Sequence, residues 1–201
     1  MNDDPLPSGI LERLERAEQL KLSGKNVEAL VILEALVQED PSNVSALEEI
    51  ADNELSLEHF TRAEIAAVQA VQLDKKSYTG HYILGFIRSH EGKWDDALAY
   101  LKEANHLKSN NPEILRCLGW VLLKSGLRLQ GIVTLERALN LDSDNTLALC
   151  DLGIAYLELQ NFPKAKALFL RALDLEPQNP RARECVAAID RLEKQVKSVR
   201  Q

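Results

Sequence analysis

The sequence predicts an all-α protein, a solenoid of tandem helix–turn–helix repeats that ends in a capping helix. Three observations lead to this fold class. Good helix formers dominate the composition, whereas glycine and proline number only 9 and 7 among 201 residues, which favours helices. A related pattern of residues recurs every 34 positions, the spacing of a repeat architecture. Proline follows Asn, Asp or Glu between several repeats, where it ends one helix and suits the first turn of the next.

The 34-residue period is clearest in the last repeat, where Leu152-Gly153 is followed by Tyr156, Ala165 and Phe169. Related residues are found on stepping back by one to four periods. One leucine column keeps the spacing without a slip: Leu73, Leu107, Leu141 and Leu175. The frame predicts a tail at residues 1–9, five repeats at 10–43, 44–77, 78–111, 112–145 and 146–179, and a final segment at 180–201.

Small side chains recur at two places in the later repeats and predict two helices that cross closely. They are Gly85, Gly119 and Gly153 at the first place, and Ala97, Gly131 and Ala165 at the second. A larger side chain at either place would separate the helix axes beyond the usual distance of about 8–10 Å. Gly24, Gly92 and Gly126 recur at the turn between the two helices, which indicates helix C-caps.

The first two repeats depart from this pattern. Arg16 occupies a column that is apolar in the other repeats, and Glu54 stands where the last repeat has Tyr156. An arginine is costly in a buried core, but one side of a terminal repeat faces water. We expect these two repeats to be the least regular and the most easily frayed.

The segment after Pro180 is expected to form one more helix. A single apolar stripe runs along it: Cys185, Ile189, Leu192, Val196 and Val199. We interpret this segment as a cap that covers the last apolar face of the solenoid. The alternative is a helix that docks into a neighbouring molecule.

These features resemble the tetratricopeptide repeat (TPR), which combines Leu-Gly, a Tyr-like residue, Ala and Phe-like positions and a terminal Pro within 34 residues. The resemblance covers residues 10–179. It implies a right-handed α-solenoid that binds other proteins. It also implies that the first helix of each repeat lines a concave groove through repeat positions 2, 5, 9, 12 and 13.

Three of these positions predict a graded binding face. Glu48 and Asp52 make its N-terminal part acidic, whereas its middle and C-terminal parts are apolar and partly aromatic, with one arginine. The predicted residues there are Tyr82, Phe86, Arg116, Trp120, Leu123, Ile154 and Leu157. Aromatic residues and arginine often dominate interface binding energy. The alternatives are that single residues pack between helices, or that the groove holds the chain's own N-terminal segment or a second copy.

The resemblance also allows one class of ligand to be set aside. Some TPR domains clamp the C-terminal carboxylate of heat-shock chaperones with Lys, Asn and Arg side chains. The corresponding columns here hold Glu48, Asp52, Tyr82 and Phe86, with Arg116 as the one residue of similar character. Acidic C-terminal peptides are therefore not expected to bind in this way.

Charge and cysteine content narrow the function classes. The net charge of −7 disfavours binding to phosphate backbones, so nucleic acid is not an expected partner. Residues 1–77 hold 16 acidic and 7 basic side chains, a net of −9, and residues 181–201 hold 3 and 6, a net of +3. Three cysteines without CxxC spacing indicate reduced thiols and a cytoplasmic protein. No signal peptide or membrane span is expected.

The sequence favours a binding protein over an enzyme. The four histidines occur singly, and no metal-type cluster, phosphate loop or nucleophile motif is present; neither a cofactor nor a metal is expected. The favoured function is a non-enzymatic adaptor or assembly scaffold that takes a peptide or helix with apolar anchors. Two alternatives remain: a TPR chaperone of a secreted or aggregation-prone client, and a self-assembling structural protein, for which a homo-oligomer is expected.

Overall fold

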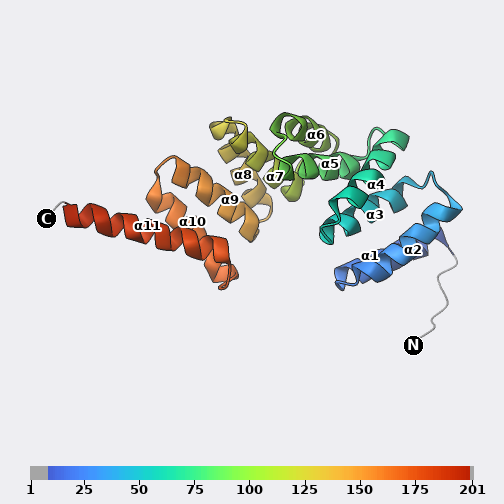
Figure 1. The fold of residues 1–201 in the computed structure, drawn as a ribbon, viewed down its shortest axis with the longest axis horizontal. Coiled ribbons are helices and arrows are strands. Elements are labelled where there is room, and N and C mark those ends of the chain that lie inside the picture. The colour runs from blue at the N-terminus through green and yellow to red at the C-terminus, as the bar shows by residue number, and fades with distance from the viewer. Residues whose placement is uncertain (1–8, 200–201) are drawn as a thin grey trace. The chain divides into compact units, whose positions relative to one another are not determined.

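The computed structural model of the protein describes residues 9–199, with side chains through residue 195. This part of the chain contains eleven helices and no strand (Figure 1), so the predicted all-α solenoid class is confirmed. Five helix pairs are followed by α11 (Pro180–Val199). The first helices of the pairs are α1 (Ile10–Leu22), α3 (Val44–Ser56), α5 (Tyr78–His90), α7 (Pro112–Lys124) and α9 (Thr146–Glu158). The second helices are α2 (Asn26–Glu39), α4 (Phe60–Leu73), α6 (Trp94–Leu107), α8 (Arg128–Leu141) and α10 (Phe162–Leu175).

The chain forms two compact units, Met1–Ser109 and Asn110–Gln201, here called the N-terminal unit and the C-terminal unit. In the N-terminal unit each helix from α1 to α6 packs against the next, and α3 also contacts α1 and α5. In the C-terminal unit consecutive helices from α7 to α11 pack in the same way, and α7 contacts α9. The division into a tail, five repeats and a separate cap stays a prediction.

The small residues do lie where two helices of a pair meet. A Cβ atom at Gly85 on α5 would lie 2.6 Å from the Leu101 side chain of α6. In the C-terminal unit a Cβ atom at Gly131 on α8 would lie 2.9 Å from the carbonyl oxygen of Gly119 on α7. Both distances are too short for a carbon atom, so the close crossing requires the absence of a side chain.

N-cap residues precede α3, α5, α7, α9 and α11, and they form a repeating column that was not predicted from the sequence. Asn43, Ser77, Asn111, Asn145 and Asn179 recur at 34-residue intervals, and each side chain accepts a hydrogen bond from a backbone N–H in the following turn. Capping of this kind satisfies N–H groups that have no partner within the helix. The 34-residue period is therefore present in the polar N-cap residues as well as in the apolar core residues.

The turn inside each pair places one residue in the left-handed region. Gly24, Gly92 and Gly126 have φ of 73°, 74° and 82°, which confirms their predicted role in ending the first helices. In the second and fifth pairs Glu58 and Gln160 adopt φ of 60° and 58°. Such conformations cost a residue with a side chain about 1 kcal/mol or more, and the packed helices on either side hold them in place.

The final helix contacts α10 along one side of its first half. Ala182 and Ile189 are fully buried there, and Cys185 packs against the same core. The predicted stripe is therefore correct at Cys185 and Ile189 but not at Leu192, which is 43% exposed. The side chains of Val196 and Val199 lie outside the described residues.

Candidate partner-binding site

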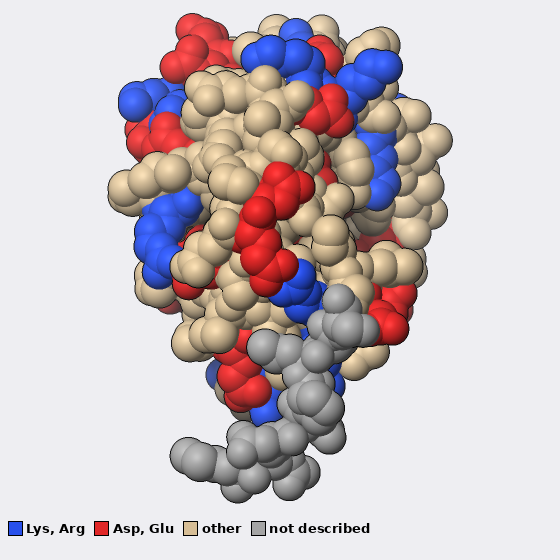
Figure 2. Space-filling view, turned by 90° about the vertical axis from the view of Figure 1, so that its right-hand side faces the viewer, with Lys and Arg blue, Asp and Glu red and all other residues tan. Residues whose placement is uncertain are grey.

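The acidic residues predicted for the binding face lie on α3 in the N-terminal unit. Asp52 forms an ion pair with Lys21 of α1, whose Nζ also lies 3.3 Å from Glu49. Burial disfavours the charged lysine, but the hydrogen bonds with Asp52 and Glu49 outweigh it and raise the pKa of Lys21. Asp52 is thus neutralised within the chain. On the face of the protein drawn in Figure 2, acidic and basic side chains lie next to one another.

Glu48 differs from Asp52 because its hydrogen-bond partner is uncharged. The buried Ser77 hydroxyl donates to Glu48 Oε1 over 2.6 Å and accepts from the Gly80 N–H at the start of α5 over 3.0 Å. Burial raises the pKa of Glu48, although the serine hydrogen bond opposes this shift. The half-buried Glu48 carboxylate is therefore joined to the cap of the next first helix and has no ion-pair partner among the described residues.

Tyr82 and Phe86 lie one turn apart on α5 in the same unit. Their ring centroids are 6.4 Å apart with an interplanar angle of 52°, a geometry that aromatic pairs favour. Tyr82 packs against the buried core of the N-terminal unit, and both side chains are half-buried. The pair therefore combines a packed inner side with an accessible outer side.

Arg116 on α7 of the C-terminal unit is almost enclosed, with 11% of its side chain exposed. It donates to Glu113 over 2.6 Å, to Asp151 of α9 over 3.4 Å and to the Cys117 sulfur over 3.2 Å. Burial disfavours its charge, but the interactions with Cys117, Glu113 and Asp151 outweigh burial and raise the pKa of Arg116. Arg116 therefore tethers α7 to α9, and most of its donors are used inside the protein.

Trp120 lies one turn beyond Arg116 and carries cations against its indole ring. Lys124 Nζ lies 4.4 Å from the ring centroid, and the guanidinium carbon of Arg181 on α11 lies 5.1 Å from it. Both distances suit cation–π attraction. Arg181 also donates to Asp151 over 2.8 Å. The half-buried Trp120 side chain is thereby held by contacts with α7 and α11.

The three predicted aliphatic residues are more enclosed than the aromatic ones. Leu123 is 7% exposed and closes over Gly131, so its side chain supports the crossing of α7 and α8. Ile154 and Leu157 are partly buried against the core of the C-terminal unit. Leu147, by contrast, is 50% exposed on α9. It occupies repeat position 2, which the TPR resemblance already assigned to the groove.

The sequence analysis missed Asp151 and Arg181, which complete the charged cluster of the C-terminal unit. Asp151 is 3% exposed; burial raises the pKa of its carboxyl, while Arg181 and Arg116 oppose the shift. A signal for it was available, because Asp151 is the one charged residue between Thr146 and Leu157. A lone acid in an apolar helix requires a cationic partner once it is buried. No comparable signal marked Arg181.

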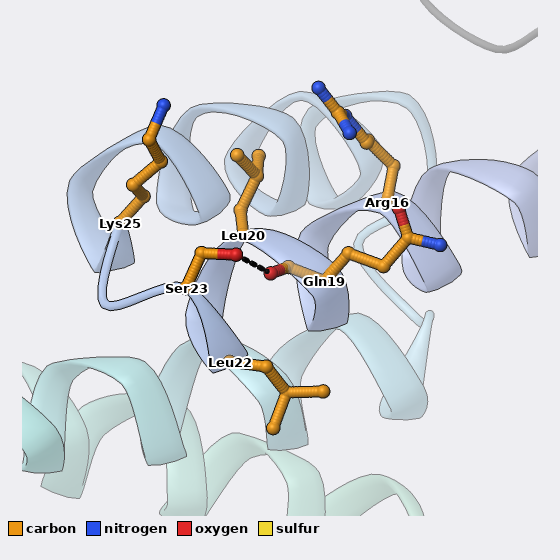
Figure 3. Close-up of a pocket in the computed structure, with 6 residues that line it drawn as sticks. All are labelled: Arg16, Gln19, Leu20, Leu22, Ser23 and Lys25. Carbon is orange, nitrogen blue, oxygen red and sulfur yellow. Dashed lines mark hydrogen bonds between the residues drawn. The ribbon is translucent and has the colours of Figure 1, made fainter.

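A pocket of the N-terminal unit is lined by residues of α1 and of the turn that follows it (Figure 3). Arg16, Gln19 and Lys25 contribute to it, and the Ser23 hydroxyl donates to the Gln19 carbonyl over 2.8 Å. Arg16 is exposed, which removes the cost expected for an arginine in a core column. Leu22, which occupies repeat position 13, also lines the pocket. The pocket therefore borders one column of the predicted groove, although none of the residues named above for the binding face lines it.

Two kinds of structural feature are absent from the described part of the chain. Among those residues no group of three or more His, Cys, Asp or Glu side chains is arranged to hold a metal ion. No described helix has both the length and the apolar character to cross a membrane.

Comparisons with known proteins place the chain among helical-repeat proteins. A tetratricopeptide-repeat family model matches residues 129–189. Three solved structures share the fold. The Cut9 and Hcn1 complex of the APC/C has a TM-score of 0.82 at 20% identity, over 92% of this chain and 37% of that one. TTC0263, a thermophilic TPR protein of Thermus thermophilus, has a TM-score of 0.69 at 23% identity, over 89% and 97%. YrrB, a TPR protein with an unusual peptide-binding site, has a TM-score of 0.63 at 20% identity, over 88% and 91%.

A curated relative matches at the level of sequence. The chain is 26% identical over 156 residues to mouse protein O-mannosyl-transferase TMTC1. The match covers 69% of this chain but only 16% of that protein's length. The 34-residue pattern, the helix pairs and the family model over residues 129–189 together support a tetratricopeptide-repeat protein.

Proposed function

We propose that the protein is a non-enzymatic, cytoplasmic interaction module that binds a peptide or helix with apolar anchors. Half-buried aromatic side chains on the first helices carry this proposal. In the N-terminal unit they are Tyr82 and Phe86, with Glu48 on the neighbouring α3. In the C-terminal unit Trp120 stands beside a cluster of charges. Accessible aromatic side chains held in a fixed geometry are typical interface hot spots.

The two units would bind partner side chains of different chemical character. A basic side chain of the partner would fit beside Glu48, because no described residue forms an ion pair with this carboxylate, although the charge of Lys108 also acts on it. Asp52 contributes less than the sequence predicted, because Lys21 already neutralises it. In the C-terminal unit an apolar anchor would rest against the accessible part of Trp120, with Ile154 and Leu157 as partly buried support.

The proposal is tested by a double variant, Phe86→Ala with Trp120→Ala, in a pull-down followed by mass spectrometry. We expect captured proteins to fall by roughly tenfold or more, as for loss of hot-spot residues. The matched control is Trp94→Ala with Phe162→Ala, which removes the same two residue types at the starts of α6 and α10. Equal capture by the wild type and the Phe86/Trp120 variant, with circular dichroism unchanged, would show that the aromatic residues do not bind the partner.

A further inference from the structure

Arg181, rather than Arg116, is the arginine of the C-terminal unit that remains open to a ligand. Its side chain is 38% exposed, against 11% for Arg116. A guanidinium has five N–H donors. Within the described residues one acceptor, Asp151, takes a hydrogen bond from Arg181, whereas Arg116 donates to Glu113, Asp151 and Cys117. The free donors of this cluster therefore belong mainly to Arg181.

The cluster also holds Arg181 in a fixed orientation. Asp151 is 3% exposed and anchors one end of the guanidinium over 2.8 Å, while the Trp120 ring lies 5.1 Å from the guanidinium carbon. An arginine fixed on an acid and an aromatic ring loses little conformational freedom when it binds a ligand. Its open donors lie beside the ring that the proposed function assigns to an apolar anchor.

We propose that Arg181 binds a carboxylate of the partner, an Asp or Glu side chain next to the apolar anchor that rests on Trp120. This inference rests on the proposed function and makes α11 part of the binding face in addition to any role as a cap. Planar guanidinium groups bind carboxylates through paired hydrogen bonds. A second source of the same group is the C-terminal carboxylate of a partner, and the experiment separates the two.

The experiment selects ligands from a random 12-residue peptide library, with every selected peptide resynthesised with an amidated and with a free C-terminus. We expect wild-type protein to enrich peptides that carry Asp or Glu within a few residues of an aromatic or large aliphatic side chain. Amidation should leave their affinity unchanged. Arg181→Ala should lower their affinity roughly tenfold, as for the loss of a charge-assisted hydrogen bond, and should abolish the acidic preference.

Two variants keep the test decisive. Arg183→Ala removes an exposed arginine two residues along α11 and should bind as the wild type does. Arg181→Lys can still pair with Asp151 but lacks the planar donors, so it should weaken binding while preserving the fold. Failure of wild-type protein to enrich any apolar peptide would overturn the proposed function itself. Enrichment of apolar peptides without acids, retention of the acidic preference by Arg181→Ala, or a requirement for a free C-terminus would overturn the inference alone.

Discussion

The same three repeat positions are joined by different chemistry in the two units. In the N-terminal unit Glu54 is fully buried between Arg62, whose Nη2 lies 2.8 Å from Oε1, and His59, whose Nδ1 lies 2.8 Å from Oε2. Arg62 also donates to Glu34 over 2.5 Å. In the C-terminal unit the equivalent positions lie three repeats, or 102 residues, further along the chain. They are Glu136, Tyr156 and Lys164, which correspond to Glu34, Glu54 and Arg62. There the tyrosine hydroxyl donates to the glutamate over 2.8 Å, and Lys164 Nζ lies 4.9 Å from the ring centroid.

The comparison shows that both units link the same three repeat positions, but that the stability of the fold depends on this link to different degrees. In the C-terminal unit the charged groups stay at the surface, and the part of Tyr156 that is buried is mainly its ring. In the N-terminal unit a glutamate carboxyl lies where water cannot reach it, so stability depends on the Arg62 guanidinium and on the hydrogen bond with His59. Glu54 Oε1 is paired with Arg62 by charge but without hydrogen-bond geometry, and the adjacent buried Asn53 Oδ1 accepts no hydrogen bond from any described residue. Part of the desolvation cost of these two oxygens is therefore uncompensated. This difference supports the expectation that the early repeats open more easily.

The largest expected effect comes from Arg62→Ala. It removes the guanidinium beside a fully buried carboxylate, so the free energy of unfolding should fall by roughly 2–4 kcal/mol, with His59 limiting the loss. The control is Lys164→Ala at the equivalent position, which removes only a cation near a ring and should cost less than about 1 kcal/mol. Urea denaturation measures both. Similar small losses would mean that the Glu54 network contributes no more than its tyrosine counterpart.

A smaller effect is expected from Tyr156→Phe, which removes the hydroxyl of the C-terminal link but keeps the ring. The bond to Glu136 lies near the surface, so we expect a loss of about 0.5–1 kcal/mol. Tyr100→Phe is the control, because the Tyr100 hydroxyl has no hydrogen-bond partner among the described residues; it should be neutral. The pKa of Tyr156 is raised by burial and by the Glu136 hydrogen bond, so tyrosine absorbance titration offers an independent readout. An unshifted Tyr156 titration would contradict the contact.

The fold was predictable because its determinants repeat. Gly85 and Gly119 mark helix crossings, and Gly24 marks a turn, through steric needs that the sequence displays directly. Glu58 and Gln160 adopt the same left-handed turn conformation although neither residue is a glycine. Their backbone geometry is imposed by the helices they connect, and that constraint exists only after packing.

The candidate site was predictable only as a list of columns. The repeat positions of Trp120 and Arg116 indicated that both residues belong to the binding face. They could not show that the Arg116 guanidinium donates its hydrogen bonds to residues of the same protein. Nor could it show that Lys21 neutralises Asp52, since the two residues come from different repeats. Pairing of side chains depends on distances between helices, and those distances follow from the packed structure.

The smallest effect concerns position 5 of the repeat, where Glu48 contacts Ser77 and the corresponding Cys150 lies near Asn179, with Sγ 4.0 Å from its Oδ1. Burial raises the pKa of both groups, that of Cys150 to about 11. The cysteine thus stays neutral through the physiological range, whereas the glutamate ionises at a lower pH, above the ordinary range of a glutamate. Because folding favours the protonated form of Glu48, ionisation lowers stability as pH rises through the raised pKa, and this cost is absent below the ordinary pKa of a glutamate.

Glu48→Gln should therefore be slightly more stable than the wild type at about pH 7 and equal to it near pH 4. Cys150→Ala, at the equivalent position, should change stability by the same amount at both pH values. Urea denaturation of the three proteins at both pH values measures the difference. If Glu48→Gln were less stable at neutral pH, the Ser77 hydrogen bond to the carboxylate would outweigh burial, and Glu48 would be explained by its structural bond to the α5 cap. A gain in stability with weaker peptide binding would instead mean that Glu48 is retained for the basic side chain of a partner.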